Sequence, residues 1–394
     1  MKDEMNRRQV RVLHVGDYWY GGGAEKVFRD TVGLSDELGF TNKVFTSENS
    51  NFGPVSYVFS LSNARKLSAI LSEFQPDVVH LQNFYHKLSP SVLWSVRRYK
   101  RASPGTRIIF TAHDMHLISP NSGFQFFGDR DACNIPLTEI PVKIFRKYDQ
   151  RGYLYSTLKI MQHVLAYRVL KLYRVIDLVV TPSYFLRDLI SRHRSDLEFK
   201  VLRNPINQRA SALPTDKPSI AGSAIRLVFF GRLSPEKGLG EFLRLCAPLF
   251  RSHSVSLDIF GDGPEEASLK SLSSRLGADE SVVFRGALSP EHVQMEMKKY
   301  SVLVLPSSWY ENAPLVICEA AAAGLPVLVR RLGGAQELAD EVKWGVSTDF
   351  SELDQTYAHI RLLASHAGEN QIVDADQYSV EHYAQQLEKI YRLS

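Results

Sequence analysis

Residues 226–238, RLVFFGRLSPEKG, combine a strand signal, a turn and a helix start. After Arg226, the four residues 227–230 form a short apolar run with strand-favouring side chains, and the run ends at Gly231. Ser234 is a suitable N-cap, and Pro235 suits the first position of a helix. A buried strand that leads directly into a helix is the repeating unit of a parallel α/β sheet. We therefore predict a strand, a loop and a helix here.

Similar apolar runs recur along the whole chain, with helical periodicity between them. The expected strands are residues 10–15, 77–81, 107–111, 177–181 and 199–202 in the first half, and 226–230, 256–260, 282–284, 302–305 and 326–329 in the second. Helical patterns such as residues 27–38 and 64–74 separate them. This alternation predicts an α/β protein with two Rossmann-like, doubly wound parallel sheets.

The length of 394 residues exceeds what one hydrophobic core usually serves. Residues 204–223 contain three prolines and no apolar periodicity, so we interpret them as a linker. We predict an N-terminal domain of residues 1–204, a C-terminal domain of residues 205–373, and a final helix within 374–394 that packs back on the first domain. Ligands of such sheets bind at the carboxyl ends of the strands, so we expect the two domains to face a shared cleft.

The composition is that of an ordinary globular protein, with 44% apolar and 23% charged residues. Neither a signal peptide nor an apolar run of about 18 residues is apparent. Three widely spaced cysteines fit a reducing compartment. We expect a cytoplasmic protein.

Positive charge is concentrated in the first half of the chain. Residues 1–205 hold 29 Lys and Arg against 19 Asp and Glu, whereas the remainder holds 18 against 24. Within residues 143–174, basic side chains alternate with aromatic ones, a pattern that suits an anionic membrane surface, although a helix packed on the core is the alternative. We expect peripheral association with the inner face of the plasma membrane, and no nucleic acid, because no nucleic-acid motif is present.

The loop after the strand at 226–230 carries Arg232 and Lys237. A lysine in the first turn of a helix is opposed by the helix dipole by about 0.3–1 kcal/mol. A bound pyrophosphate would more than offset that cost, since two cations and the helix amides suit its charge. We predict a phosphate-binding pocket with a charge-stabilising, catalytic role.

A second loop and helix, residues 306–324, contains Glu311 before the expected helix and Glu319 within it. Eight residues of helix span about 12 Å, which is enough to contact both ends of a nucleotide sugar. The residues between them that we assign to donor binding are Asn312, Ala313, Pro314 and Leu315.

Two further signals lie in the first domain. Gly21, Gly22 and Gly23 follow the first strand and allow close backbone approach to an anion, although a flexible surface loop is the simpler interpretation. His113 ends the strand at 107–111, where it is either a catalytic side chain or a histidine satisfied by a backbone group. Asp129 and Asp131 have D-x-D spacing but sit in a polar loop, so we expect no metal ion.

In the order of these motifs the chain resembles the retaining nucleotide-sugar glycosyltransferases of family four, which have the GT-B fold. Residues 311–319 match the family's E-x7-E motif, and residues 231–238 match its G-R-x-x-x-x-K-G loop. The resemblance implies that Arg232 and Lys237 hold the donor pyrophosphate and that Glu319 binds the ribose. It further implies that Glu311 contacts the transferred sugar and that His113 lies beside its reacting face.

The expected function is thus retaining, metal-independent transfer of a hexosyl group from a nucleotide sugar, UDP-sugar being favoured, to a glycan or a lipid-linked acceptor in polysaccharide or glycolipid synthesis. No cofactor is expected beyond this co-substrate. An epimerase or glycan phosphorylase on the same fold and a catalytically silent scaffold subunit are the alternatives. Residues 204–207, Asn-Pro-Ile-Asn, depart from the family's usual Asn-Gly-x-Asp. Alanines follow Glu319 where the family usually has Glu-Ala-Met-Ala.

Overall fold

A computed structural model describes residues 9–47, 53–128, 132–206, 225–369, 371 and 376–392. The chain forms two compact units. Unit 1 consists of Met1–Asn204 and Val380–Ser394, and unit 2 of Pro205–Ser379. Most of the expected linker, residues 207–223, lies outside the described residues.

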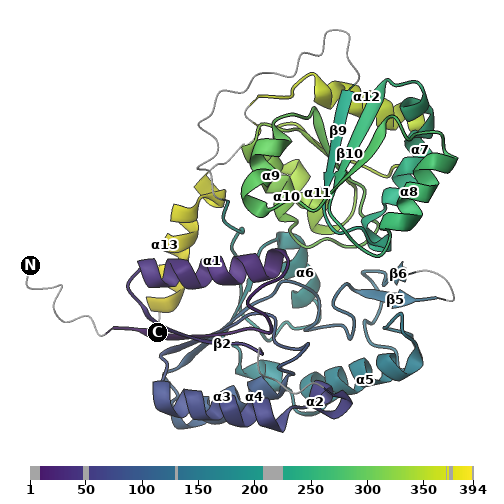
Figure 1. Ribbon diagram of the computed structural model, residues 1–394. Helices are drawn as coiled ribbons and strands as arrows, with labels where there is room; N and C mark the ends of the chain where they lie inside the picture. The colour runs from purple at the N-terminus through teal and green to yellow at the C-terminus, as the bar shows by residue number, and fades with distance from the viewer. Residues whose placement is uncertain are drawn as a thin grey trace, which may run out of the picture. The chain divides into compact units, whose positions relative to one another are not determined.

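Unit 1 contains a parallel sheet of six described strands in the order β2-β1-β3-β4-β7-β8. The strands are β1 (Arg11–Val15), β2 (Thr41–Phe45), β3 (Val78–Leu81), β4 (Arg107–Thr111), β7 (Leu178–Thr181) and β8 (Phe199–Val201). The α-helices are α1 (Gly23–Glu37), α2 (Pro54–Val58), α3 (Leu61–Phe74), α4 (Ser91–Ala102), α5 (Tyr153–His163), α6 (Tyr184–Ser191) and α13 (Val380–Arg392). Helices α1 and α13 lie on one face of the sheet, and α3 and α4 lie on the other (Figure 1).

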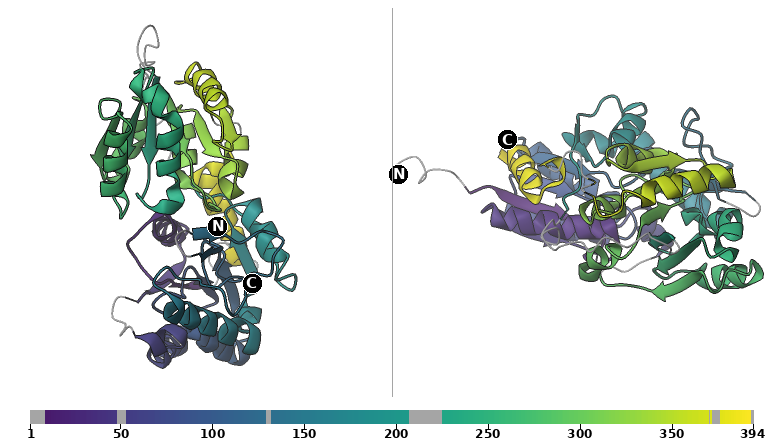
Figure 2. Two further views of the ribbon diagram at one scale, coloured as in Figure 1. Left: turned by 90° about the vertical axis from the view of Figure 1, so that its right-hand side faces the viewer. Right: turned by 90° about the horizontal axis from the view of Figure 1, so that it is seen from above.

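The final helix, α13, belongs to the core of unit 1 although it follows unit 2 in sequence. It lies beside α1 in Figure 1 and in the view from above in Figure 2. The hydroxyl of Tyr383 is 2.9 Å from Thr31 Oγ1, and that of Tyr391 is 2.6 Å from Nδ1 of His80. Because both tyrosines are buried, these bonds satisfy polar groups that would otherwise be costly to enclose.

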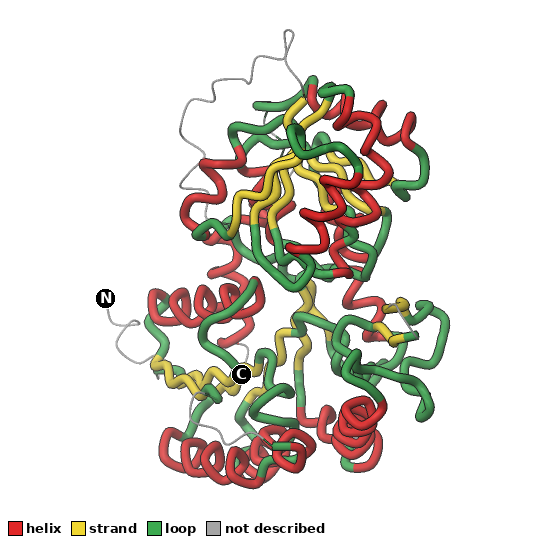
Figure 3. Tube along the Cα trace, turned by 45° about the vertical axis from the view of Figure 1, so that its right-hand side comes forward, coloured by secondary structure: helices red, strands yellow, loops and turns green. Residues whose placement is uncertain are grey.

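A long segment with little regular structure connects β4 to α5, and its described part is mostly loop (Figure 3). A short antiparallel pair, β5 (Gln125–Phe127) and β6 (Ala132–Asn134), is its one described sheet. After α5 the chain continues as a π-helix, Val164–Val169, and a 3-10 turn, Leu172–Val175.

Unit 2 contains a second parallel sheet of six described strands, in the order β11-β10-β9-β12-β13-β14. The strands are β9 (Ile225–Phe230), β10 (Val255–Phe260), β11 (Val282–Gly286), β12 (Val302–Leu305), β13 (Val327–Arg330) and β14 (Gly345–Thr348). The helices are α7 (Leu239–Arg251), α8 (Glu266–Arg275), α9 (Pro290–Met297), α10 (Leu315–Ala322), α11 (Gly333–Asp340) and α12 (Leu353–Ala364), with 3-10 turns at Pro235–Lys237 and Asp376–Tyr378. Helices α7 and α8 cover one face, and α9, α10 and α11 cover the other (Figure 1).

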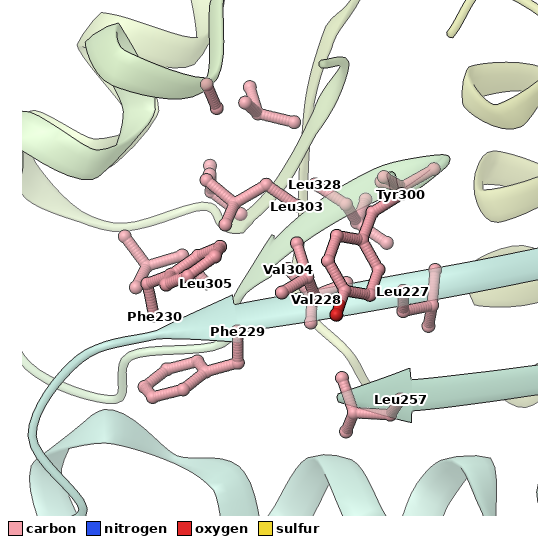
Figure 4. Packing of buried hydrophobic residues seen from close by; sticks show 14 of the residues in the cluster. Leu227, Val228, Phe229, Phe230, Leu257, Tyr300, Leu303, Val304, Leu305 and Leu328 are labelled. Carbon is pink, nitrogen blue, oxygen red and sulfur yellow. The ribbon is translucent and has the colours of Figure 1, made fainter. Parts of the chain in front are cut away.

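The core of unit 2 is built on β9, whose inner residues are buried on both faces of the sheet. Figure 4 shows Phe229 and Val228 among side chains of the neighbouring strands, including Leu257 and Leu303. A strand buried on both faces has an almost continuous apolar sequence, which is why this segment carries so strong a signal.

The predicted fold class, α/β with two doubly wound parallel sheets, is confirmed. Strands β2 and β14 were not predicted, because each is an edge strand and its sequence, TNKVF or GVST, lacks a continuous apolar run. Within the described residues, no helix combines the length and apolar character needed to span a bilayer.

Candidate functional site

The central strands of unit 2 place two motif-bearing loops next to each other. Strand β9 pairs with β12 at Leu227↔Val302 and Val228↔Leu303, and the strand order reverses between them. In open α/β sheets this reversal opens the crevice in which ligands bind, at the carboxyl ends of the strands. The loops that follow, 231–238 and 306–314, therefore start at the expected ligand position of this unit.

The loop after β9 differs locally from the prediction. Residues Pro235–Lys237 form a single 3-10 turn, and α7 begins only after Gly238, whose φ is +69°. The side chain of Ser234 donates to Glu236 Oε1 at 2.7 Å and makes no cap hydrogen bond. The expectation that Ser234 caps a helix with Lys237 in its first α-helical turn is therefore wrong.

Close backbone packing explains this change. A Cβ atom on Gly238 would lie 2.1 Å from the carbonyl oxygen of Pro306, so the two loops touch through their main chains. The amide of Ser308 also donates to the carbonyl of Glu236 at 2.8 Å. The left-handed conformation that only glycine adopts readily interrupts the helix and lets the two loops meet.

Lys237 and Glu311, which the sequence assigned to one donor site, form a direct ion pair. Lys237 Nζ lies 2.6 Å from Glu311 Oε1, and the hydroxyl of Ser307 donates to the same oxygen at 2.8 Å. The Lys237 ammonium also lies over the ring of Trp309, 5.4 Å from its centroid. The Lys237 and Glu311 side chains are 17% and 9% exposed, so this is a largely buried pair.

Burial alone would raise the pKa of Glu311, but the charge and hydrogen bond of Lys237 and the bond from Ser307 outweigh it, so that the pKa is lowered. Glu311 is therefore a carboxylate at neutral pH. Ser307 and Trp309 were not predicted as site residues, although both lie inside the motif-bearing loop.

Arg232, from the same loop as Lys237, is exposed. Its side chain makes no ion pair with the described part of the chain. One cation of the predicted phosphate pocket is thus fixed by a carboxylate, and the other is accessible to solvent.

The second loop leads into α10 as predicted. Asn312, Ala313, Pro314 and Leu315 are half-buried, and Pro314 is the N-cap residue of α10. Glu319 lies within α10 and is half-buried, between the buried side chains of Cys318 and Ala320.

The loop is fixed from its other side by the start of α11. The amide of Gly334 donates to the carbonyl of Glu311 at 2.7 Å, and a Cβ on Gly334 would lie 1.5 Å from the carbonyl oxygen of Asn312. The backbone that carries Glu311 is therefore held by tight glycine contacts on two sides.

In unit 1 the glycine loop and His113 likewise lie at the carboxyl ends of the strands. Gly21, Gly22 and Gly23 are exposed, and α1 starts at Gly23 with Gly22 as its N-cap residue. His113 follows β4, and its Nε2 is 2.5 Å from Oε1 of Gln82, which follows β3. Burial lowers the pKa of His113 to about 4, so the imidazole is neutral at physiological pH.

Two aspartates at the carboxyl ends of the unit 1 strands were not predicted as site residues. Asp17 follows β1 and accepts hydrogen bonds from the amides of His86, Lys87 and Leu88 at 2.7–2.9 Å. Burial raises its pKa to about 6, and burial also raises the pKa of Asp114 to about 7. Asp17, Gln82 and His113 line one small pocket, and the signal that could have found Asp17 and Gln82 is a polar residue within two positions of the end of a strand.

The segment 143–174 is less uniform than its sequence pattern implied. Residues 143–152 are not helical, and Tyr148, Tyr167 and Tyr173 are buried in the core. For these three aromatic residues of the pattern, the structure shows the alternative named from the sequence, packing on the core. The most exposed apolar side chains of the segment are Ile144 (71%), Phe145 (94%), Tyr153 (69%), Leu154 (74%) and Val169 (65%), and Tyr155 and Met161 are exposed as well.

No group of three or more His, Cys, Asp or Glu side chains arranged to hold a metal ion occurs among the residues that the structure describes. Asp129 and Asp131 lie outside the described residues.

Residues 215–380 match the family described as glycosyl transferases group 1, and residues 21–209 match glycosyltransferase family 4. The chain belongs to the GT-B glycosyltransferases that these two family descriptions cover, one for each half of the chain.

Two curated relatives match over part of their length. An uncharacterised glycosyltransferase of Methanocaldococcus jannaschii is 31% identical over 140 residues, which cover 32% of this chain and 36% of the relative. The GDP-mannose-dependent alpha-(1-6)-phosphatidylinositol monomannoside mannosyltransferase of Mycolicibacterium smegmatis is 31% identical over 135 residues, 32% of this chain and 35% of the relative. The matched region thus spans about a third of each relative.

The fold is shared over nearly the whole chain with the Anabaena protein HepE, solved with UDP and glucose. That structure has a TM-score of 0.66 and 18% sequence identity, and the match covers 98% of this chain and 100% of HepE.

Proposed function

We propose that this protein transfers a hexosyl group from a nucleoside diphosphate sugar, with UDP-sugar favoured, to a glycan or lipid-linked acceptor. The observation that carries this proposal is the buried Lys237–Glu311 pair at the strand-order reversal of unit 2, with Arg232 exposed on the same loop. The UDP and glucose of Anabaena HepE support the donor class, and the name of the Mycolicibacterium relative supports a lipid-linked acceptor.

Binding of the donor diphosphate is assigned to Lys237 and Arg232. Departure of the diphosphate builds negative charge on phosphate oxygen, and a cation that is already in place lowers that barrier without reorganisation. The bonds from Lys237 and Ser307 to one oxygen of Glu311 fix the position of the ammonium before any ligand arrives. Glu311 then has two roles in the proposal: it orients Lys237, and it contacts the transferred sugar together with the backbone of residues 312–315.

We assign the ribose hydroxyls to Glu319 and place the acceptor hydroxyl at the unit 1 pocket that His113 lines. A neutral imidazole does not oppose the positive charge that develops on the transferred sugar, whereas a protonated one would. In the proposed retaining reaction, the bond from the anomeric carbon to phosphate oxygen breaks while the bond to the acceptor oxygen forms on the same face. The acceptor proton passes to the leaving phosphate.

The most direct test is a panel of nucleoside diphosphates and nucleotide sugars in a thermal-shift assay. A ligand at 100 times its dissociation constant adds about 2.7 kcal/mol of stability. We expect UDP and a UDP-hexose to stabilise wild type more than GDP or ADP. Stabilisation by none of these ligands would contradict the proposal, and stabilisation by GDP alone would correct the base.

Metal independence is the second testable part. Lys237 and Arg232 supply positive charge where a divalent ion would otherwise act, so we expect transfer to survive exhaustive chelation. Activity that disappears with chelator and returns with Mg²⁺ or Mn²⁺ would contradict this part of the proposal and direct attention to Asp129 and Asp131.

We also propose that the exposed apolar residues Ile144, Phe145, Tyr153 and Leu154 contact an anionic bilayer. The excess of positive charge in residues 1–205 is complementary to such a surface. Lys143 and Arg146 already pair with Glu139, so the apolar side chains are the better targets for mutation.

Burying one large apolar side chain contributes about 1.5–3 kcal/mol. The Phe145→Ser, Leu154→Ser double variant should therefore bind vesicles containing phosphatidylglycerol at least about 100-fold more weakly in a sedimentation assay. Leu362→Ser, an exposed position on α12 of unit 2, is the control. Equal binding by the double variant and wild type would remove this surface from the proposal.

A further inference from the structure

A pocket at the opposite end of the unit 1 strands from His113 has no part in the proposed reaction. It lies where α4 ends before β4 and where the turn Leu172–Val175 precedes β7, so it is at the amino ends of these strands. His113 follows the carboxyl end of β4, and a strand of five residues rises about 16 Å. The pocket is therefore separate from the residues assigned to catalysis.

Five cationic side chains line this pocket, together with Pro104 and Val175. They are Arg97, Lys100, Arg101, Lys171 and Arg174. The pocket is open and has a volume of about 440 Å³, within the range of small-molecule sites. A concave surface lined by charges of one sign concentrates the field and attracts an ion of the opposite sign.

Three of the five cations have structural partners. Arg97 Nη1 donates to the carbonyl of Leu170 at 2.9 Å, Lys100 pairs with Asp177, and Arg174 Nε lies 3.2 Å from Asp196 Oδ2. Lys100 and Arg101 also occupy the last turn of α4, where cations are favoured by the helix dipole. These contacts account for Arg97, Lys100 and Arg174 without any ligand.

Arg101 and Lys171 are different. Both side chains are exposed, and neither has a hydrogen-bond or ion-pair partner within the described ranges. The dipole of α4 does not account for Lys171, because this residue is not part of that helix. The five cations outnumber their two paired carboxylates, Asp177 and Asp196, by three.

The backbone supports a role for Lys171 beyond structure. Its φ is +48°, in the left-handed region that disfavours a side chain, and it lies between the π-helix and the turn Leu172–Val175. Glycine would satisfy this conformation with less strain. The bond from Arg97 to Leu170, the neighbouring residue, holds Lys171 at the pocket.

We propose that this pocket binds a phosphate monoester, with Arg101 and Lys171 as its free contacts. A phosphate monoester carries a charge near −2 at neutral pH and accepts several hydrogen bonds, which matches the excess of cations. Arginine and lysine are the side chains that recognise such oxygens. The phosphate group is either that of a soluble metabolite or the headgroup of a lipid.

The test compares the full-length wild type with the Arg101→Gln, Lys171→Gly double variant. Calorimetric titration with inorganic phosphate and glycerol 3-phosphate examines the soluble source. Sedimentation with vesicles of phosphatidic acid, set against phosphatidylglycerol at equal charge, examines the lipid source. Arg98→Gln, an exposed position on the same helix outside the pocket, is the matched control.

We expect the double variant to bind the phosphate ligand at least about 100-fold more weakly, because loss of each charge-assisted contact costs about tenfold or more. The Arg98→Gln variant should bind as wild type does. The melting temperatures of both variants should stay close to the wild-type value, because all three replaced side chains are exposed. In the double variant, glycine at position 171 also relieves backbone strain, which offsets the loss of a cation from the last turn of α4. Binding to any other phosphate site is common to all three proteins and cancels.

A loss confined to soluble phosphates identifies a metabolite site, and a loss confined to phosphatidic acid identifies a lipid headgroup site. Either outcome supports the proposal. Equal affinities of wild type and double variant in both assays, or an equal loss in Arg98→Gln, would overturn it. UDP stabilisation of all three proteins is measured in parallel, so that failure of this proposal is distinguished from failure of the proposed function.

Discussion

The two units have similar parallel sheets, and in each the candidate site residues lie in loops at the carboxyl ends of the strands. These loops follow β9 and β12 in unit 2, and β1, β3 and β4 in unit 1. The pKa values of buried carboxyl groups in the two sets of loops are shifted in opposite directions. In unit 2, Glu311 is buried yet its pKa is lowered, because Lys237 lies beside it. In unit 1, burial raises the pKa of Asp114 and lowers that of His113, and no ion pair with a described residue offsets the effect on Asp114.

This difference shows that burial by itself favours the neutral form of a side chain, and that a fixed partner of opposite charge is needed to keep a buried group ionised. In unit 2, the Glu311 carboxylate keeps the Lys237 ammonium in a fixed position, which suits the binding of a negatively charged diphosphate. Unit 1 keeps the His113 imidazole neutral, and this group can exchange hydrogen bonds with a hydroxyl.

The largest effect should come from removing the cations of unit 2. We expect Lys237→Ala and Arg232→Ala each to lower turnover at least about 100-fold, as loss of one preorganised charge-stabilising group does. Only Lys237→Ala should also lower the free energy of unfolding, by about 3–5 kcal/mol, since it leaves Glu311 buried without its partner.

Turnover and urea unfolding measured on both variants test this distinction. Unchanged turnover in either variant would contradict the phosphate assignment. Equal stability of the two variants would mean that the buried pair contributes less than its geometry indicates.

The close contact of the two unit 2 loops can be broken at Gly238. In Gly238→Ala the new methyl group meets the Pro306 carbonyl in a left-handed conformation, and we expect a loss of about 2–5 kcal/mol. Gly277 has a similar φ of +65°, but its nearest neighbour, Arg251 Cδ, is 3.7 Å away. Gly277→Ala should therefore cost only the conformational strain, about 1–2 kcal/mol. Chemical unfolding of both variants measures the difference, and equal losses would show that the Pro306 contact is easily relaxed.

The opposite pKa displacements predict opposite dependences of stability on pH. The pKa of Asp114 is raised to about 7, so the folded state binds more protons than the unfolded state between about pH 4 and 7. Wild type should therefore lose stability relative to Asp114→Asn as pH rises through this window, by up to about 1.4 kcal/mol per pH unit.

For Glu311 the sign is reversed. Its lowered pKa contributes stability above its ordinary value, and this contribution is lost as pH falls through the folded-state value. Wild type should lose stability relative to Glu311→Gln on acidification. Unfolding curves of the three proteins between pH 3 and 8 check both slopes, and slopes of the same sign would contradict the comparison.

The smallest effect on turnover is expected for Glu319→Ala. Ribose contacts exist in both the ground and the transition state, so their loss raises KM for the donor more than it lowers kcat. Steady-state kinetics with varied donor concentration provide the measurement. A large fall in kcat with KM intact would assign Glu319 to the chemical step instead.

The sequence by itself determined the class of fold, because strands buried on both faces, such as β9, carry apolar runs that leave few alternatives. It also placed Lys237 and Glu311 in the segments that follow two strands of the second sheet, although it expected Lys237 in the first turn of a helix. Their direct pairing could not be predicted, because 74 residues separate them and only the adjacency of β9 and β12 brings them together.

Tertiary structure alone decided the details that depend on packing. The sequence of Ser234 and Pro235 is typical of a helix start, but the contact between Gly238 and Pro306 requires a 3-10 turn instead. The basic and aromatic composition of residues 143–174 suits a membrane surface, yet the core of unit 1 buries Tyr148, Tyr167 and Tyr173. The pKa values of Asp114 and His113 likewise follow from burial. The local sequence does not predict this burial, because the side chains that enclose these two residues come from strands and loops far along the chain.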